Sequence, residues 1–447
     1  MTRSTAPGPL VLDTTQEGER KRDGIIPMHP AVLRVSLHRW AVFFATLEPG
    51  VWDGTRSILW QLRDGFPGGS ILREGIVRAC VNDWDPLGRG DRCSRRCGTP
   101  VAFGVPKGAC RGGCPLPTAN RFVLRWYVFG FPLQDGRPVS PLGGRYAALH
   151  PGAKEAAART LRVEWMQFRL NEAEDDLEVL LPPQPMRERG CSPGNAFSSL
   201  GAGRSHVLGI TSPLAANPEA TEWLGFDTFA PWRELHSEIA AIGFRFDPAA
   251  SLYDWSRTGP AIRLGDGVRI GEACPLRLPS GWAAATRDFG VDRRTRWLRF
   301  ADPFAPPERV LIAPADEGPR EGSRTAYLCA DGVLRLFGNN NAWRTRGRDV
   351  LCAWDVDLGS FTFTRRQTLF APREAGLPFG RPFVDMAKLC SPEDGTQRVV
   401  FRCLAHPQVS RHDESLVPTE EENRVAGIYQ APVHLGKSPS AEWEFAG

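Results

Sequence analysis

Four cysteines gathered in one loop have the most distinctive spacing in this sequence. Cys93, Cys97, Cys110 and Cys114 follow the pattern C-x3-C-x12-C-x3-C within the Gly- and Pro-bearing segment 84–118. Two close pairs of thiolates suit a tetrahedral structural zinc ion, although pairs with two intervening residues are commoner. Two disulfides in an oxidising compartment, or four free thiols, are the alternatives. A catalytic zinc is not expected, because a four-cysteine site leaves no coordination position open.

Arginine dominates the basic residues, since only five of the 55 are lysine. Planar guanidinium groups hold carboxylates through paired hydrogen bonds, so two or three converging arginines would bind an anionic sugar. The formal net charge is only +4, which does not favour nucleic acid as a partner.

The elements that must position these side chains are short strands. Alternating apolar and polar residues predict strands at 31–46, 56–63, 121–131, 161–171, 177–182, 239–247 and 251–264, with further strands towards the C-terminus. Asp-Gly pairs between them, such as Asp64-Gly65 and Asp331-Gly332, are typical of hairpins. Helical patterns are few, and short helices are expected at the segments 152–160, 218–224 and 231–242.

This pattern predicts an all-β protein: a six- or seven-bladed β-propeller with long decorated loops. Residues 1–25 are expected to form a flexible lead-in, and 26–447 a single propeller domain with the Cys-rich loop at 84–118. Helical crossovers for a parallel sheet are missing from the pattern, and one sandwich is too small for so many strands. We expect the ring to be closed by pairing of N- and C-terminal strands.

Three stretches resemble blades of sialidase-like β-propellers, the group with BNR-type repeats. They are HRWAVFFAT to TRSILWQLRDG (38–65), GEACPLRLPSGWAAATRDF (271–289) and the segment 323–361, which begins SRTAYLCADGVLRLFGN. The likeness covers 30–40% of the chain, and the S-x-D-x-G-x-x-W consensus is degenerate throughout. The resemblance implies a carbohydrate site at the mouth of the central channel, in an architecture that hosts both glycoside hydrolases and polysaccharide lyases.

The resemblance also indicates which polar residues face that site. It implies carboxylate-binding roles for arginines at strand ends and a sugar-reading role for one amide: Arg56, Arg287, Arg324, Arg348 and Asn339. A sialidase-type reaction would need a glutamate-activated tyrosine and a separate aspartic acid. Glu272 and Tyr327 are the candidate pair, and Asp53 is one candidate acid.

Histidines suit the alternative reaction, β-elimination at a uronate. That reaction needs a base for the C5 proton, an acid for the leaving oxygen and a group that neutralises the carboxylate. His38, beside Trp40, and His206, in a Gly-rich segment, are the best-placed histidines.

The sequence therefore predicts a carbohydrate-active enzyme that cleaves a glycosidic bond at an acidic or deoxy sugar, by hydrolysis or β-elimination. A propeller that binds glycan or protein without catalysis is the alternative. We expect a carbohydrate partner, no nucleic acid and no membrane, and no cofactor besides the zinc ion considered above. No secretory signal is recognised, which favours a cytoplasmic protein, or a secreted or periplasmic one if the N-terminus has been trimmed.

Overall fold

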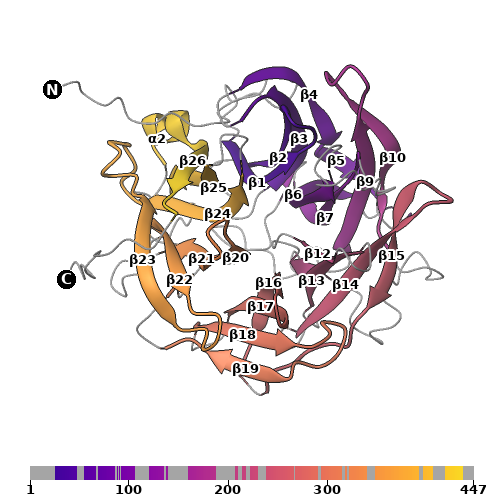
Figure 1. The fold of residues 1–447 in the computed structure, drawn as a ribbon. Coiled ribbons are helices and arrows are strands. Elements are labelled where there is room, and N and C mark those ends of the chain that lie inside the picture. The colour runs from indigo at the N-terminus through magenta and orange to yellow at the C-terminus, as the bar shows by residue number, and fades with distance from the viewer. Residues whose placement is uncertain are drawn as a thin grey trace.

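A computed structural model shows six antiparallel sheets arranged as blades around a central axis, as Figure 1 displays along that axis. The structure describes residues 26–47, 55–66, 69–85, 88, 90, 92–105, 120–134, 137–138, 160–187, 207–209, 214–217, 222–229, 238–265, 267–289, 293–314, 318–319, 322–339, 348–391, 396–405 and 418–435. The predicted all-β propeller is confirmed, with six blades. The predicted lead-in, 1–25, lies outside the described residues.

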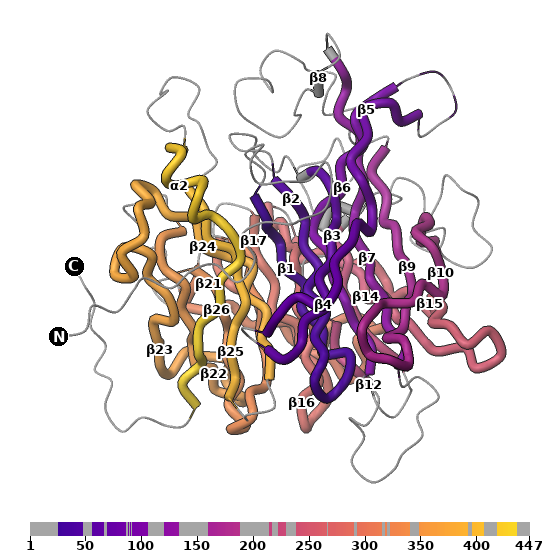
Figure 2. Tube along the Cα trace, turned by 90° about the horizontal axis from the view of Figure 1, so that it is seen from above, coloured from indigo at the N-terminus to yellow at the C-terminus, as the bar shows by residue number. Residues whose placement is uncertain are grey.

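The first two blades come from the N-terminal part of the chain. Blade 1 consists of β1 (Ile26–Arg34), β2 (Arg39–Leu47), β3 (Thr55–Asp64) and β4 (Ser70–Arg78). Blade 2 consists of β5 (Val81–Trp84), β6 (Cys93–Val105), β7 (Arg121–Gln134), β8 (Arg137–Pro138), β9 (Arg162–Leu170) and β10 (Leu177–Pro185). Figure 2 shows β5 and β8 standing above the other strands at one end of the ring.

The third and fourth blades follow around the ring. Blade 3 consists of β11 (Val207–Gly209), β12 (Ala215–Asn217), β13 (Glu222–Phe229), β14 (Glu238–Asp247) and β15 (Leu252–Thr258). Blade 4 consists of β16 (Ile270–Leu278), β17 (Gly281–Asp288), β18 (Thr295–Phe300) and β19 (Arg309–Ile312). The expected helices at 218–224 and 231–242 are wrong where the structure describes them, because 222–229 and 238–247 form the paired strands β13 and β14. Tertiary pairing overrides a weak local helical pattern here. Residues 152–159 of the expected helix at 152–160 lie outside the described residues.

The last two blades complete the ring. Blade 5 consists of β20 (Thr325–Leu328), β21 (Leu334–Asn339), β22 (Leu351–Val356) and β23 (Phe363–Phe370). Blade 6 consists of β24 (Pro382–Cys390), β25 (Gln397–Ala405) and β26 (Gly427–Val433), with α2 (Glu420–Val425) before β26. No helix among the described residues is long and apolar enough to cross a membrane.

In the part of the chain that the structure describes, the first and last blades meet by packing; the expected pairing of N- and C-terminal strands stays a prediction, because residues 1–25 and 436–447 lie outside that part. Among the described strands β1 pairs only with β2, and it packs against all three strands of blade 6. Apolar side chains from blades 1, 2, 5 and 6 form one continuous core, which includes Phe43, Phe168, Phe337 and Phe401. The first and last blades therefore share one buried core, which holds the ring shut.

Polar turns close the outer hairpins of four successive blades. Asn171 in blade 2, Asp247 in blade 3, Asp302 in blade 4 and Asp357 in blade 5 each accept a hydrogen bond from a backbone N–H a few residues further on. Such side-chain turns offer the backbone a partner where the ladder ends. The Asp331-Gly332 hairpin between β20 and β21 is also confirmed, and Gly332 supplies its positive φ of 76°.

Irregularities recur on strands near the axis. Pairing is interrupted between Met28 and Ala31 on β1, between Gly98 and Val101 on β6, between Gly271 and Cys274 on β16, and between Asp385 and Lys388 on β24. Each interruption contains a non-glycine residue with positive φ: His29, Thr99, Glu272 and Met386. Bulges of this kind re-aim side chains and are common beside functional sites.

Candidate functional site

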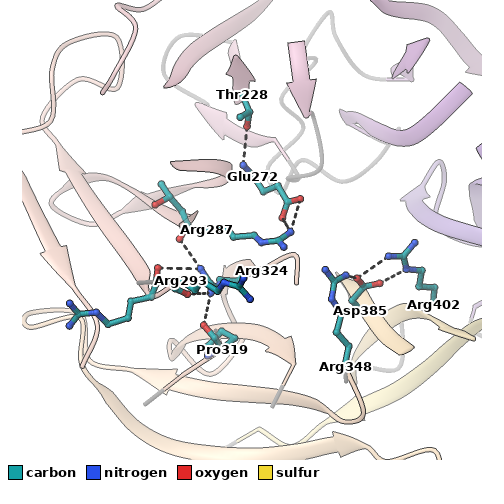
Figure 3. Close-up of polar contacts among 11 residues, drawn as sticks. Thr228, Glu272, Arg287, Arg293, Pro319, Arg324, Arg348, Asp385 and Arg402 are labelled. Carbon is teal, nitrogen blue, oxygen red and sulfur yellow. Dashed lines mark hydrogen bonds and ion pairs between the residues drawn. The ribbon is translucent and has the colours of Figure 1, made fainter. Parts of the chain in front are cut away.

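The polar residues of the candidate site lie at one end of the propeller, where blades 4, 5 and 6 meet near the axis (Figure 3). Strands β16 and β24 begin at this end, β17 and β25 finish there, and Arg348 precedes β22. Side chains that are distant in the sequence are thus brought together because neighbouring strands of each blade run in opposite directions. We call the set Glu272, Arg287, Arg348, Asp385 and Arg402 the axial cluster.

The blade 4 half of the axial cluster is an ion pair between Glu272 and Arg287. Arg287 Nη1 lies 3.1 and 3.0 Å from the two carboxylate oxygens of Glu272, and its guanidinium lies over the Phe289 ring. The Glu272 backbone, at φ 47°, is held by its N–H, which donates to Thr228 Oγ1 at 2.9 Å. The side chains of Arg287 and Glu272 are 18% and 15% exposed, so this pair remains in contact with solvent.

The blade 5 and 6 half is built on Asp385, which is fully buried. Arg402 donates to both carboxylate oxygens of Asp385, and Arg348 donates to Oδ2. Both guanidiniums lie over the ring of Phe383. Burial favours a raised pKa for Asp385, but Arg402 and Arg348 outweigh it and lower the pKa to about 2. Asp385 is therefore a fixed anion, not a proton donor, near neutral pH.

The two halves belong to one electrostatic environment. Burial lowers the pKa of Arg348, and the negative charge of Asp385 opposes this shift. The charges of Arg287, Arg402 and Glu272 also act on the Arg348 guanidinium. Arg348 is joined to blade 6 through its carbonyl, which accepts from Val384 N at 2.7 Å. Three guanidiniums thus converge on two carboxylates, an excess of positive charge that suits an anionic ligand.

A chain of hydrogen bonds extends the axial cluster to blades 1 and 2. Arg402 Nη1 contacts His29 Nε2 at 2.5 Å, His29 Nδ1 lies 3.2 Å from Thr99 Oγ1, and Thr99 Oγ1 donates to the Tyr127 hydroxyl at 3.1 Å. Burial and the charge of Arg402 lower the pKa of His29 well below its usual value. We assign Nδ1 as the protonated nitrogen, because Nε2 must accept from Arg402.

His29 was not among the histidines singled out from the sequence. The signal that could have marked it is the unusual Pro27-Met28-His29-Pro30 run at the start of a strand, since two prolines interrupt regular pairing. His38, which was singled out, is exposed in the turn after β1. It lies at the other end of that strand, roughly 15 Å or more along it from His29, and does not join the axial cluster.

The structure gives Arg324 a different role from the predicted carboxylate anchor. Its side chain is 1% exposed, and its two terminal nitrogens donate to the carbonyls of Thr286, Arg293, Arg294 and Pro319 (Figure 3). Burial lowers the pKa of Arg324 to about 9. Arg324 links blade 5 to blade 4 through these hydrogen bonds, so we interpret it as a structural residue that supports the axial cluster.

Tyr327 is half-buried on β20, and Asn339 ends β21. The Tyr327 ring packs edge-on against Phe337, and burial raises the pKa of its hydroxyl well above the usual value, which disfavours a phenolate. Asn339 is fully buried, and its Nδ2 donates to the carbonyl of Val384. The contact of Asn339 corrects its predicted sugar-reading position, because this side chain joins β21 to β24. The predicted catalytic role of Tyr327 stays a prediction.

The remaining predicted residues are placed only in part. Arg56 is the second residue of β3, at the end of blade 1 that also carries His29, and it is half-buried. The structure brings Glu272, Arg287 and Arg348 together, and it adds Arg402 and Asp385, which the sequence analysis missed. His206 and Asp53 lie outside the described residues.

Half of the Cys-rich motif is described. Cys93 and Cys97 are buried on β6; Cys93 Sγ donates to the carbonyl of Trp84 at 3.3 Å, and burial raises the pKa of Cys97. Cys110 and Cys114 lie outside the described residues. The part of the chain that the structure describes contains no group of three or more metal-ligating side chains, so zinc, disulfides and free thiols all stay open for this motif.

Comparisons with known proteins agree with this architecture. No protein-family model and no curated protein matches the chain. Among solved structures, a protein of unknown function from Dyadobacter fermentans is 11% identical, with a TM-score of 0.55, 96% of this chain covered and 97% of that one. NanB sialidase from Streptococcus pneumoniae is 9% identical, with a TM-score of 0.54 and coverages of 95% and 70%.

A third similar structure is the sialidase of Trypanosoma rangeli, 9% identical with a TM-score of 0.51. The match covers 91% of this chain but only 54% of that sialidase, so this chain spans about half its length. Identities this low establish the fold alone. The chain accordingly has the fold of a sialidase-like, six-bladed β-propeller.

Proposed function

We propose that the protein binds a carbohydrate bearing a carboxylate at the axial cluster and cleaves the adjacent glycosidic bond. The observation that carries this proposal is the convergence of Arg287, Arg348 and Arg402, from three blades, on one end of the propeller axis. Guanidiniums bind carboxylates in paired, directional hydrogen bonds that a neutral sugar does not provide.

Arg287 is the arginine best placed to contact the ligand. It is the most exposed of the three, and its Glu272 partner is also partly exposed. Arg348 and Arg402 share the buried Asp385, so they serve mainly to hold positive potential at the axis. A ligand carboxylate would then displace water from the guanidinium of Arg287, and the buried half of the cluster would stay unchanged.

Glu272 is the carboxylate that we assign to the chemistry. It sits at a bulge with positive φ, its backbone is fixed by Thr228, and its side chain is partly exposed. A carboxylate in that position can act as base or as nucleophile at the anomeric carbon. This assignment favours hydrolysis over β-elimination, because His29, the histidine that the described residues place beside the cluster, is buried and engaged through both nitrogens.

The test is incubation of the purified protein with a panel of acidic and matched neutral glycans, following reducing ends and unsaturated-uronate absorbance together. We expect reducing ends to increase without new absorbance, and only for acidic glycans. Arg287→Met should lower activity about ten- to a hundred-fold, which is the worth of one charge-assisted hydrogen bond pair.

Arg335→Met is the matched control, because Arg335 is a fully buried arginine whose ion pairs with Asp331 and Asp355 lie within blade 5. It should lower stability and leave the activity of folded protein near that of wild type. New unsaturated-uronate absorbance would show that the protein cleaves by β-elimination and not by hydrolysis. Binding of acidic glycan without any cleavage would make the protein a glycan-binding propeller, and equal activity in Arg287→Met would remove the axial cluster from the site.

A further inference from the structure

A second group of arginines surrounds one carboxylate at the junction of blades 1 and 2. Arg78 ends β4 and Arg162 begins β9, and both form ion pairs with Glu164, which is fully buried. Arg162 Nη2 lies 2.6 Å from Glu164 Oε1, and Arg78 Nη2 lies 3.1 Å from the same oxygen. Glu164 therefore holds two guanidiniums from different blades against one carboxylate oxygen.

Arg95 on β6 adds a third guanidinium, and Trp84 at the end of β5 adds an aromatic ring. Arg95 Nη2 donates at 2.9 Å to the carbonyl of Ala79, the residue that follows Arg78. The Arg162 guanidinium lies over the Trp84 ring, 4.9 Å from its centroid. We call the set Arg78, Arg95, Arg162, Glu164 and Trp84 the Glu164 cluster.

The charges of the Glu164 cluster do not balance. Among the described residues, Glu164 is the only acidic group that forms an ion pair with any of its three guanidiniums. At the next junction, between blades 2 and 3, buried Arg125 is matched by buried Asp227. Burial lowers the pKa of Arg95, and the positive charge of Arg78 adds to this shift. The excess of positive charge suits an anionic ligand.

The guanidiniums of the Glu164 cluster reach the surface, although the carboxylate does not. The side chains of Arg78 and Arg162 are 24% and 28% exposed, whereas that of Glu164 is 0% exposed. Arg95 and Trp84 are half-buried. An approaching anion therefore meets guanidinium donors beside an indole ring, and the carboxylate lies behind them. Donors for an oxyanion next to an aromatic surface are the groups that an acidic sugar requires.

The Glu164 cluster lies at the same end of the propeller as the axial cluster. Neighbouring strands of blade 1 are antiparallel, so His29, near the start of β1, and Arg78, at the end of β4, share one end. Arg95 precedes Thr99 on β6 by about 13 Å of extended strand, and Thr99 contacts His29. His29 in turn contacts Arg402 of the axial cluster. The two clusters thus occupy one face, and a single extended ligand can reach both.

We propose that the Glu164 cluster is a second anion subsite, which binds a carboxylate or sulfate of an acidic polysaccharide while another acidic sugar of the same chain occupies the axial cluster. Two separated arginine clusters on one face match a polymer with repeated acidic groups, because one acidic sugar reaches only one of them. Two linked contacts raise the affinity for the polymer above that of either site alone. The inference deepens the proposed function and rests on it for the role of the axial cluster.

The experiment measures binding of the full-length protein to immobilised polysaccharides by biolayer interferometry in the cold. The surfaces carry polygalacturonate, dextran sulfate or dextran, which present carboxylates, sulfates or no charge. We expect binding to at least one acidic polymer and none to dextran, and the polymer that binds identifies the preferred acidic group. Arg95→Met should weaken this binding about five-fold or more. It removes one guanidinium and leaves both ion pairs of Glu164 in place, and Arg95→Lys should restore most of the affinity.

Arg92→Met is the matched control. Arg92 lies directly before β6 and pairs with Asp83, and the two side chains are 67% and 69% exposed. The control loses the same charge as Arg95→Met, so it should bind the polymer as the wild type does. Equal losses in the two variants, or no binding of the wild type to either acidic polymer, would overturn the inference. Equal binding to immobilised polyuridylate would overturn the polysaccharide as the ligand and assign the subsite to nucleic acid.

Separate readouts distinguish this inference from the proposed function. Cleavage of short acidic glycans by Arg287→Met reports on the axial cluster, and polymer binding by Arg95→Met reports on the Glu164 cluster. Loss of cleavage in Arg287→Met together with unchanged polymer binding in Arg95→Met would leave the proposed function standing and remove the second subsite. Polymer binding that depends on Arg95, without cleavage of any glycan, would keep the anion subsite and remove the proposed reaction.

Discussion

Replacement of Asp385 by asparagine tests how the buried half of the axial cluster is held together. The variant is nearly isosteric, but it removes the negative charge that, among the described residues, contacts both Arg348 and Arg402. Breaking a buried ion pair by removal of one partner costs about 3–5 kcal/mol, because the remaining charges stay buried without compensation. We expect a loss of that order in the free energy of unfolding of Asp385→Asn, measured by urea denaturation at neutral pH.

The pH dependence gives a second magnitude for the same carboxylate. The pKa of Asp385 falls from 3.8 to about 2 on folding, and at about 1.4 kcal/mol per pH unit this contributes roughly 2.5 kcal/mol. Because the folded pKa is the lower one, this stabilisation is present above about pH 4 and is lost as the pH falls towards 2. The free energy of unfolding of Asp385→Asn should therefore lack the part of the decrease between about pH 4 and pH 2 that Asp385 causes in the wild type.

Asp355→Asn is the control for both measurements. Asp355 is also buried between two arginines, Arg335 and Arg365, but it lies within blade 5. The Asp355→Asn variant should be less stable than the wild type at neutral pH. Its free energy of unfolding should still show the decrease between pH 4 and pH 2 that comes from Asp385. The reasoning is refuted if Asp385→Asn unfolds at the same urea concentration as wild type and shows the same decrease between pH 4 and pH 2.

Three other predictions follow from single contacts. Stability of the wild type should fall below about pH 6.5 by up to ~1.4 kcal/mol per pH unit, because buried His29 stays neutral while the unfolded state takes up a proton; His29→Gln should lack this slope in urea titrations at several pH values. Gly98→Ala should cost about 1–3 kcal/mol in thermal or urea unfolding, because the new Cβ would lie 2.4 Å from the Tyr127 ring; unchanged stability would show that the ring moves freely. Arg324→Met should lower stability by leaving buried carbonyls without donors, yet preserve the glycan affinity of the folded fraction; a selective loss of affinity would return Arg324 to the ligand site.

The architecture could be predicted because strand alternation and turns are local signals. Segments such as 121–131 and 161–171 alternate in the sequence and pair in blade 2 as β7 and β9. Blade closure could not be predicted in the same way, because it depends on the packing of β1 against blade 6. The sequence pattern predicts where the strands are, but it does not predict which element packs against each sheet edge or face.

The candidate site was predictable only where a residue falls at a strand end within a recognisable blade. Glu272 and Arg287 are 15 residues apart in one hairpin, so a local pattern was enough to link them. Asp385 and Arg402 also share a hairpin, but no resemblance marked it. Arg324 looked equivalent to Arg348 in sequence, and only the structure shows that its donors are spent on carbonyls. The partner separates these two buried arginines, carbonyls for Arg324 and the Asp385 carboxylate for Arg348, and the choice of partner depends on tertiary structure.

The recurrent bulges explain why one end of this propeller is chemically distinct. A regular strand would direct alternate side chains into the two neighbouring blades, where most side chains pack as apolar core. At His29, Thr99 and Glu272 the backbone adopts positive φ, at a cost of order 1–3 kcal/mol each that the surrounding structure must offset. Each bulge re-aims a polar side chain, and the three lie on different blades. A fold that repeats this irregularity around its axis can thus change its ligand by substituting a few bulge residues, while the packed blades behind them stay the same.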